Sequence, residues 1–286
     1  MIEKINIAVA GYGVFGSQLI AWLVKNHPEI STICVIEPNR HKRDLLKKLK
    51  LNPFESIFDV PKDLIQQIEV VVDCSTRGQG VINKGYYEGF GLRAIFQNGE
   101  EDHRVGGLFF PGLNHWEENP MYLKIPLCSG LAAIKVVKTL SELTKVNYIS
   151  GIHCKVTNTA RMLTMNYQDS NDQLKALLGV KSNMNVIYLR GEPYNGIFAY
   201  HGWIEVETEK KLYVSDIIDV VSGSSENLKL ESQDIDNIFY PRTTDTIIIK
   251  DSINVKGKIV RLSTMSFTPD VNFPINLAAI KYLSRV

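Results

Sequence analysis

The sequence predicts an α/β protein: a doubly wound domain with a parallel sheet, followed by an α+β domain with a mainly antiparallel sheet. Over the first half of the chain, short apolar runs rich in β-branched residues alternate with helical stretches, as right-handed βαβ crossovers require. After residue 143 the strand patterns become longer and the helices fewer. A chain of 286 residues that is 44% hydrophobic is long enough to bury the cores of two domains.

The first domain consists of strands that each lead into a turn or a helix. The predicted strands are residues 4–10 (KINIAVA), 31–37 (STICVIE), 68–74 (IEVVVDC), 92–97 (LRAIFQ) and 108–113 (LFFPGL), the last of them weakened by Pro111. The predicted helices are residues 17–25, a basic stretch that ends at residue 50, and a stretch that ends at residue 90. The β-branched run at 68–74 is typical of a parallel sheet covered on both faces.

The second domain begins with a helix from residue 129 to 143 and continues as a sheet. Its predicted strands are residues 147–158, 195–207, 246–250 and 256–266, with a turn at 251–255. Residues 214–221 (VSDIIDVV) predict a helix packed against that sheet, and Pro274 opens a last helix at 275–283.

Charge and hydropathy limit the partners. The chain has 32 Lys and Arg against 31 Asp and Glu, so its formal charge of +1 creates no field that attracts nucleic acid or a membrane surface. It has no uninterrupted apolar span of about 18 residues, and it starts directly with a strand pattern. We therefore expect a cytoplasmic protein that binds small molecules and copies of itself, not nucleic acid or a membrane.

The four cysteines lie far apart, and none forms a C-x-x-C pair or a zinc-like spacing with the six histidines. We expect reduced thiols and no metal site. Cys34 and Cys74 fall in strands, where buried thiols are usually inert. Cys154 follows His153, but adjacent strand residues face opposite sides. Cys128 is therefore the favoured candidate for a reactive thiol; the alternative is a small residue that fills a core.

A glycine motif indicates a dinucleotide site. Gly11, Gly13 and Gly16, with Tyr12, Val14 and Phe15 between them, follow a strand and precede a helix, the context of the Rossmann G-x-G-x-x-G fingerprint. The first glycine permits a tight turn, the second lets the backbone approach a pyrophosphate, and the third allows close packing of helix on strand. The phosphates would face the helix N-terminus.

The choice between NAD and NADP depends on the end of the second strand. Glu37 lies about 20 residues after Gly16, where an acidic side chain accepts a hydrogen bond from the ribose 2′-hydroxyl of NAD. The alternative for Glu37 is an ordinary solvated strand end. A basic run could instead hold the 2′-phosphate of NADP if Glu37 turned away: Arg40, His41, Lys42 and Arg43.

Three segments resemble the archaeal-type (type II) glyceraldehyde-3-phosphate dehydrogenases: the glycine motif, residues 71–114 with their AIFQNGE run, and residues 251–257 (DSINVKG). The chain is similar to a divergent, shortened member of that family. The resemblance implies a dinucleotide-binding domain at 1–127, a catalytic domain at 128–272, and a C-terminal helix at 273–286 that returns to the first domain. It also implies a homo-oligomer, a tetramer or a dimer. The further cofactor contacts that we expect are Cys74, Ser75, Thr76, Asn98 and Asn276.

On this resemblance Cys128 is the catalytic nucleophile, and the first turn of a helix suits that role because it favours a thiolate. The thiolate would attack an aldehyde, and the thiohemiacetal would pass hydride to NAD and leave a thioester. The reverse reaction would reduce an activated acid. His201 lies where the family places its histidine, and a neutral imidazole suits a base. The alternative for His201 is a strand histidine in a core or an interface.

The substrate site departs from the family. Where the family reads Ser-Cys-Asn-Thr-Thr-Gly, this chain has residues 127–132 (LCSGLA), so the side chains that would hold a phosphate are lost. Backbone N–H groups of Ser129 and Gly130 would still form an oxyanion hole. Lys155, Arg161 and Arg190 would bind a different anion, or are surface charges. We therefore expect an aldehyde or activated acid other than a triose phosphate.

Three functions remain open at this point. The first is an NAD(P)-dependent aldehyde dehydrogenase or acyl reductase that uses Cys128 and His201. The second is a non-covalent NAD(P)-dependent ketone or imine reductase in which Cys128 is structural. The third is a catalytically inactive relative that binds NAD.

Overall fold

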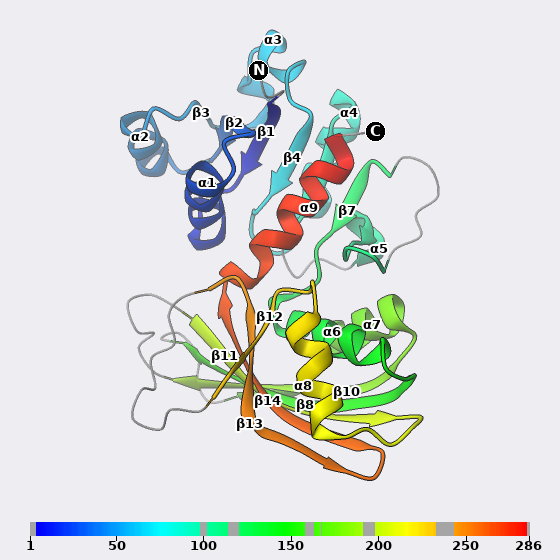
Figure 1. Cartoon of the computed structure of the whole chain (residues 1–286). Helices are drawn as coiled ribbons and strands as arrows, with labels where there is room; N and C mark the ends of the chain where they lie inside the picture. The colour runs from blue at the N-terminus through cyan, green and yellow to red at the C-terminus, as the bar shows by residue number, and fades with distance from the viewer. Residues whose placement is uncertain are drawn as a thin grey trace. The chain divides into compact units, whose positions relative to one another are not determined.

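The computed structural model describes residues 4–97, 102–113, 120–157, 163–166, 168–190, 198–232 and 243–284. Its contacts divide the chain into two compact units (Figure 1): unit 1 is Met1–Pro126 with Phe273–Val286, and unit 2 is Leu127–Asn272. The predicted fold class is confirmed, because unit 1 contains a parallel sheet with helices between its strands and unit 2 a mainly antiparallel sheet with helices.

Unit 1 is a Rossmann domain. In chain order its elements are β1 (Ile5–Ala10), α1 (Val14–Asn26), β2 (Ile30–Ile36), α2 (Arg40–Lys48), β3 (Pro53–Phe54), η1 (Ile57–Asp59), α3 (Lys62–Ile65), β4 (Val70–Asp73), α4 (Gln79–Phe90), β5 (Arg93–Phe96), α5 (Asp102–Val105), β6 (Gly107–Leu108), β7 (Tyr122–Lys124) and α9 (Phe273–Ser284). Among the described residues seven strands pair in parallel, in the order β3-β2-β1-β4-β5-β7-β6. The order reverses between β1 and β4, where such sheets bind ligands.

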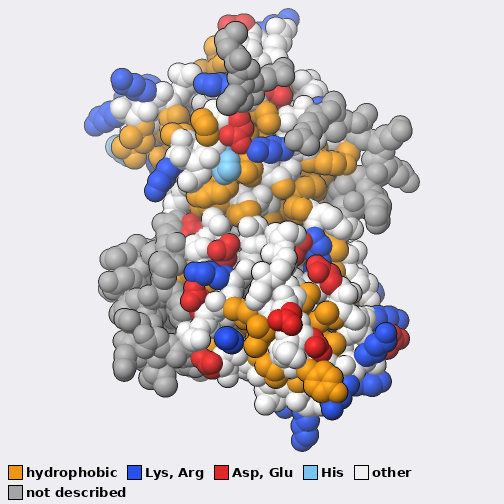
Figure 2. Space-filling model, viewed as in Figure 1, with side chains coloured by type: hydrophobic (Ala, Val, Ile, Leu, Met, Phe, Trp, Pro, Cys, Tyr) orange, Lys and Arg blue, Asp and Glu red, His pale blue; other side chains and the backbone are white. Residues whose placement is uncertain are grey.

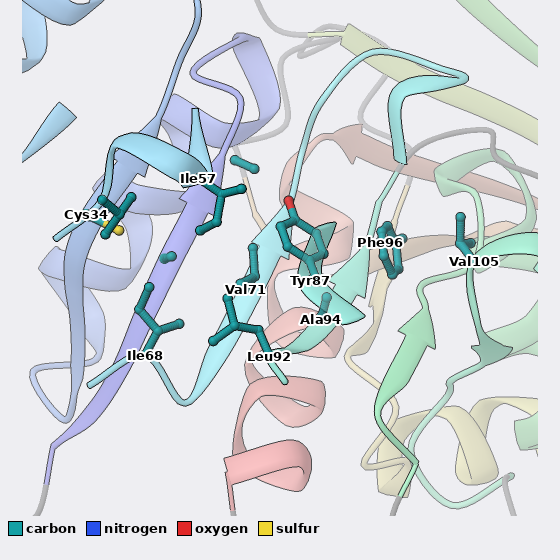
Figure 3. Packing of buried hydrophobic residues seen from close by; sticks show 12 residues of the cluster. Cys34, Ile57, Ile68, Val71, Tyr87, Leu92, Ala94, Phe96 and Val105 are labelled. Atoms are coloured by element: carbon teal, nitrogen blue, oxygen red, sulfur yellow. The ribbon is translucent and has the colours of Figure 1, made fainter. Parts of the chain in front are cut away.

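The core of unit 1 explains why its central strands are uniformly apolar. Every residue of β4 is buried, as a strand covered on both faces requires. Figure 3 shows buried side chains packing across the sheet, among them Val71 of β4, Ala94 and Phe96 of β5 and Tyr87 of α4.

The last helix, α9, belongs to unit 1. The Phe273 ring lies 5.8 Å from that of Phe15 and 5.4 Å from that of Trp22, both on α1. Arg93 of β5 donates a hydrogen bond to the Leu283 carbonyl (2.8 Å). Helix α9 therefore packs beside α1 and is tied to the sheet by β5.

Unit 2 is built on a second sheet. Its elements are α6 (Cys128–Ser141), β8 (Val146–Thr157), β9 (Leu163–Asn166), α7 (Gln168–Leu178), β10 (Lys181–Arg190), β11 (Phe198–Thr208), α8 (Val214–Gly223), β12 (Leu228–Glu231), β13 (Thr246–Lys256), β14 (Ile259–Thr268) and η3 (Asp270–Asn272). Seven described strands follow the order β12-β13-β14-β11-β8-β10-β9. The β8–β10 and β12–β13 pairs are parallel, and the other pairs are antiparallel.

The sheet of unit 2 has two unlike faces. Helices α6, α7 and α8 pack on one of them, which we call the inner face (Figure 1). The opposite, outer face carries exposed apolar side chains, among them Ile152 (41% exposed) and Trp203 (51%). The two faces decide which side chains of β8 and β11 can reach α6.

Two sequence predictions differ from the structure, and some of its elements were not predicted. The turn expected at 251–255 is wrong, because β13 continues to Lys256, with irregular pairing to β14 between Ile249 and Asn254, and the chain turns at Gly257. The strand expected at 108–113 ends at Leu108, ahead of Pro111, which has no backbone N–H to donate. Helix α7 and strand β10 were not predicted: α7 is largely polar in sequence, although Ser170, Asn171 and Gln173 are buried.

The surface agrees with the balanced composition. Basic and acidic side chains are both scattered over the face seen in Figure 2. In the described part of the chain, no helix combines the length and the apolar character that crossing a bilayer requires.

Candidate functional site

The glycine turn at the end of β1 is shaped by close backbone contacts. Gly11 has φ +90°, and a Cβ on it would lie 2.7 Å from the Cys74 carbonyl oxygen. A Cβ on Gly16 would lie 2.1 Å from the Gly11 carbonyl oxygen. Gly13, the N-cap of α1, faces open space. The turn therefore holds the start of α1 against β4 and leaves the helix N-terminus accessible to an anion.

Glu37 is held in one orientation at the end of β2. Its carboxylate is almost fully buried and accepts hydrogen bonds from the backbone N–H groups of Tyr12 (2.8 Å) and Asn39 (3.0 Å). Lys42 Nζ lies 3.5 Å from Glu37 Oε2. Glu37 is thus no solvated strand end, and two backbone donors keep it from turning away.

The basic run after Glu37 is mostly directed elsewhere. Arg43 donates hydrogen bonds to the carbonyl oxygens of Glu37 (2.9 Å) and Pro38 (2.5 Å) and to the Glu55 carboxylate (2.8 Å). Arg40 and His41 are exposed on α2. Next to Glu37 lies a pocket, described below. In the basic run from Arg40 to Arg43, only Lys42 lines it.

A pocket of about 410 Å³ joins these parts within unit 1. That volume is typical of small-molecule sites. The predicted cofactor residues that line the pocket are Gly11, Gly13, Glu37, Cys74, Ser75 and Thr76. The structure therefore places six of the twelve predicted cofactor residues around one pocket.

Asp73 organises the loop after β4, and the sequence analysis missed it. Its buried carboxylate accepts hydrogen bonds from Ser75 N (2.9 Å), Asn83 Nδ2 (2.8 Å) and Tyr87 Oη (2.9 Å). Burial, and then the Asp73 charge, raise the pKa of Tyr87 well above its usual value, so Tyr87 stays a donor. An acidic residue that ends an all-apolar strand was the available signal.

The other predicted cofactor residues that the structure describes do not line this pocket. Val14 is 58% exposed at the start of α1, and the Phe15 ring packs against α9. Asn276 of α9 is fully buried, and its amide exchanges hydrogen bonds with the amide of Gln97 at the end of β5. Asn98 lies outside the described residues.

Cys128 is the first residue of α6 and is partly exposed. Its Sγ lies 3.6 Å from the phenol oxygen of Tyr200 on β11, within hydrogen-bond distance for sulfur. Tyr200 is only 4% exposed. The cysteine is therefore accessible and has a proton-bearing group beside it.

The first turn of α6 uses part of its backbone internally. Gly130 N donates to the Leu127 carbonyl oxygen (2.9 Å), and Leu127 N donates to Gln173 Oε1 (3.0 Å). The oxyanion hole expected from Ser129 and Gly130 therefore lacks a free Gly130 N–H. Gln173, buried on α7, is a second residue that the sequence analysis missed.

The structure does not bring His201 to Cys128. On β11 the buried residues Tyr200 (4% exposed) and Ile204 (2%) face α6, whereas the His201 ring stacks on Trp203 at 4.6 Å on the outer face. Burial lowers the pKa of His201. The alternation of Ile204 and Val206 with Glu205 and Glu207 was the signal that assigns Tyr200 to the inner face.

The other cysteines have unfavourable surroundings for a nucleophile. Burial raises the pKa of Cys34 to about 12, and burial together with the Asp73 charge raises that of Cys74 well above its usual value. Burial also raises the pKa of Cys154. Cys154 pairs across strands with His201, so it lies on the outer face.

The expected anion-binding residues are only partly described. The backbone of Lys155 pairs with Tyr200 in the β8–β11 register, and that of Arg190 ends β10. The side chains of Lys155, Arg190 and Ser129 are not described, and Arg161 lies outside the described residues.

Comparisons with known proteins find distant relatives that share one name. No protein-family model matches the chain. It is 22% identical to the glyceraldehyde-3-phosphate dehydrogenase of Metallosphaera sedula over 325 aligned positions, which cover 98% of this chain and 93% of the relative. The corresponding protein of Saccharolobus islandicus is 21% identical over 99% and 93%. That of Sulfurisphaera tokodaii is 23% identical over 52% and 47%.

The chain is similar to archaeal glyceraldehyde-3-phosphate dehydrogenases. The similarity extends over both units, and the Rossmann unit supplies the glycine turn, the oriented carboxylate and the pocket that NAD requires. An NAD(P)-dependent dehydrogenase is the class that the fold and these relatives together indicate.

Proposed function

We propose that the protein oxidises an aldehyde, or reduces an activated acid, through a covalent thiohemiacetal and thioester on Cys128, with NAD as hydride carrier. The observation that carries the proposal is the position of Cys128: it is partly exposed at the first turn of α6, with the Tyr200 hydroxyl 3.6 Å from its sulfur. NAD would accept hydride at its nicotinamide ring.

The cofactor preference rests on Glu37. A carboxylate held by Tyr12 N and Asn39 N accepts a hydrogen bond from a ribose hydroxyl and repels a 2′-phosphate. Lys42, 3.5 Å from the same carboxylate, offsets part of that repulsion. We therefore expect NAD to be used in preference to NADP.

A triose phosphate is not the expected substrate. Residues 129–131 (SGL) stand where the family carries phosphate-binding side chains, and the Gly130 N–H is engaged with Leu127. An aldehyde or acyl group with a different tail fits this proposal better.

The test is turnover of a panel of aldehydes and acyl phosphates with NAD and with NADP. We expect Cys128→Ser to lower kcat by at least about a thousandfold without preventing NAD binding, because the nucleophile is lost. Cys154→Ser, the same change on the outer face, should retain activity. Full turnover of Cys128→Ser would refute covalent catalysis and favour the non-covalent reductase.

A further inference from the structure

The inner face of the unit 2 sheet carries a small cluster of polar side chains below the start of α6. His153 of β8 is 2% exposed, Thr264 of β14 is 1% exposed, and Tyr200 of β11 is 4% exposed. The rings of His153 and Tyr200 lie 6.3 Å apart between centroids. Tyr200 reaches Cys128, so the cluster places a buried imidazole beside the phenol that contacts the cysteine.

Gly202 provides the space for this cluster. In the register of β11 it lies opposite His153 on β8 and opposite Thr264 on β14. A Cβ on Gly202 would lie 2.4 Å from His153 Cδ2 and 2.6 Å from Thr264 Oγ1. The imidazole therefore occupies the volume that a side chain at position 202 would fill, which keeps it next to the Tyr200 ring.

We propose that Tyr200 is the residue that exchanges a proton with the reacting groups on Cys128, and that His153 is the positioning residue that holds the Tyr200 phenol and takes up its proton. This deepens the function proposed above and rests on it. The base is thus on the inner face, one residue from the His201 that the sequence suggests.

Oxidation of the thiohemiacetal removes one hydride and one proton, and each has its own acceptor. When the thiohemiacetal is oxidised, the electron pair of its C–H bond leaves as hydride to NAD⁺, and the C=O bond re-forms. The hydroxyl proton of the hemiacetal moves to the Tyr200 oxygen while the phenol proton moves to the His153 imidazole, directly or through a water. The products are the Cys128 thioester, NADH and an imidazolium, which returns its proton to solvent.

Geometry gives Tyr200 access to that proton. The hemiacetal oxygen is two bonds from Cys128 Sγ, and the phenol oxygen is 3.6 Å from Sγ. His201 lacks this access because its ring stacks on Trp203 on the outer face.

The experiment uses the full chain in a Cys154→Ser background and measures alkylation of Cys128 by iodoacetamide, followed by peptide mass, from pH 5 to 10. Aldehyde turnover is measured beside it. Tyr200→Phe should shift the pH profile of alkylation and lower kcat by about a hundredfold or more, with KM little changed. Tyr148→Phe, the same change on the outer face of β8, should match the parent in both measurements.

His153 is tested in two ways, because a buried histidine can be needed for folding. His153→Gln removes the imidazole, and Gly202→Ala displaces it; both should shift the alkylation profile in the direction of Tyr200→Phe while thermal unfolding stays cooperative. A wild-type profile and wild-type turnover in Tyr200→Phe would overturn the proposal, as would a loss confined to His201→Gln. If no aldehyde is turned over but Tyr200→Phe still shifts the pH profile of Cys128 alkylation, the proposed dehydrogenase function fails, and the proton exchange between Tyr200 and Cys128 stands.

Discussion

Helices α1 and α6 both begin at a candidate site, yet their first turns are built differently. Their N-cap residues, Gly13 and Leu127, carry no hydrogen-bonding side chain. At α1 the turn is shaped by backbone alone, since Gly16 and Gly11 touch without any side chain between them. At α6 it is held by a side chain from another helix, Gln173 of α7. The candidate cofactor site is thus shaped by backbone contacts, and the surroundings of Cys128 by side chains.

The first turn of α1 should be the most sensitive position. Gly16→Ala would place a Cβ 2.1 Å from a backbone carbonyl oxygen, which cannot move aside cheaply. We expect the unfolding free energy to fall by about 3 kcal/mol or more and NAD binding to be lost, measured by thermal unfolding and fluorescence titration. Gly85→Ala on α4, where nothing lies within 4 Å, should instead be neutral or stabilising. Unchanged NAD affinity in Gly16→Ala would contradict a backbone-built site.

Helix α6 also differs from α1 in burying a charge. Lys135 is 1% exposed, and burial lowers its pKa from 10.5 to about 8. Because the unfolded state holds the proton more tightly, stability should rise with pH between about 8 and 10.5. Lys135→Met should raise the unfolding free energy by up to about 3 kcal/mol at pH 7 and by much less at pH 10.

Chemical denaturation at the two pH values measures this effect. Lys138→Met, one turn further along α6, removes an ion pair with Glu226 and should bring no such gain. An equal gain at both pH values would mean that Lys135 does not titrate in this range.

The smallest expected effect is at the first turn of α6 itself. Gln173→Leu leaves the Leu127 N–H without its acceptor, which costs about 1–3 kcal/mol of unfolding free energy. We expect slower alkylation of Cys128 and lower turnover, with NAD affinity unchanged. Gln168→Leu, exposed on the same helix, is the control. A parallel loss of NAD affinity would show that the two helix starts are not independent.

The same difference explains how much the sequence could predict. Gly11, Gly16 and Glu37 were predicted because a positive φ, a close contact and a fixed chain distance are local properties. Tyr200 was not predicted: the alternation along β11 assigns it to the apolar face, but the contact of that face with α6 follows from pairing with β8 and β14 far along the chain. Gln173 is part of a polar helix whose burial only the tertiary structure determines.

The position of α9 in the chain affects the order in which the parts of unit 1 are synthesised. Unit 1 is made of the two ends of the described chain, and Asn276 pairs with Gln97 across the whole intervening unit 2 segment. On the ribosome, strands β1 to β7 of unit 1 emerge before unit 2, and α9 emerges after it. The cofactor domain therefore becomes complete only after the cysteine domain has been made, so a chain cut short before Phe273 lacks part of its NAD-binding unit.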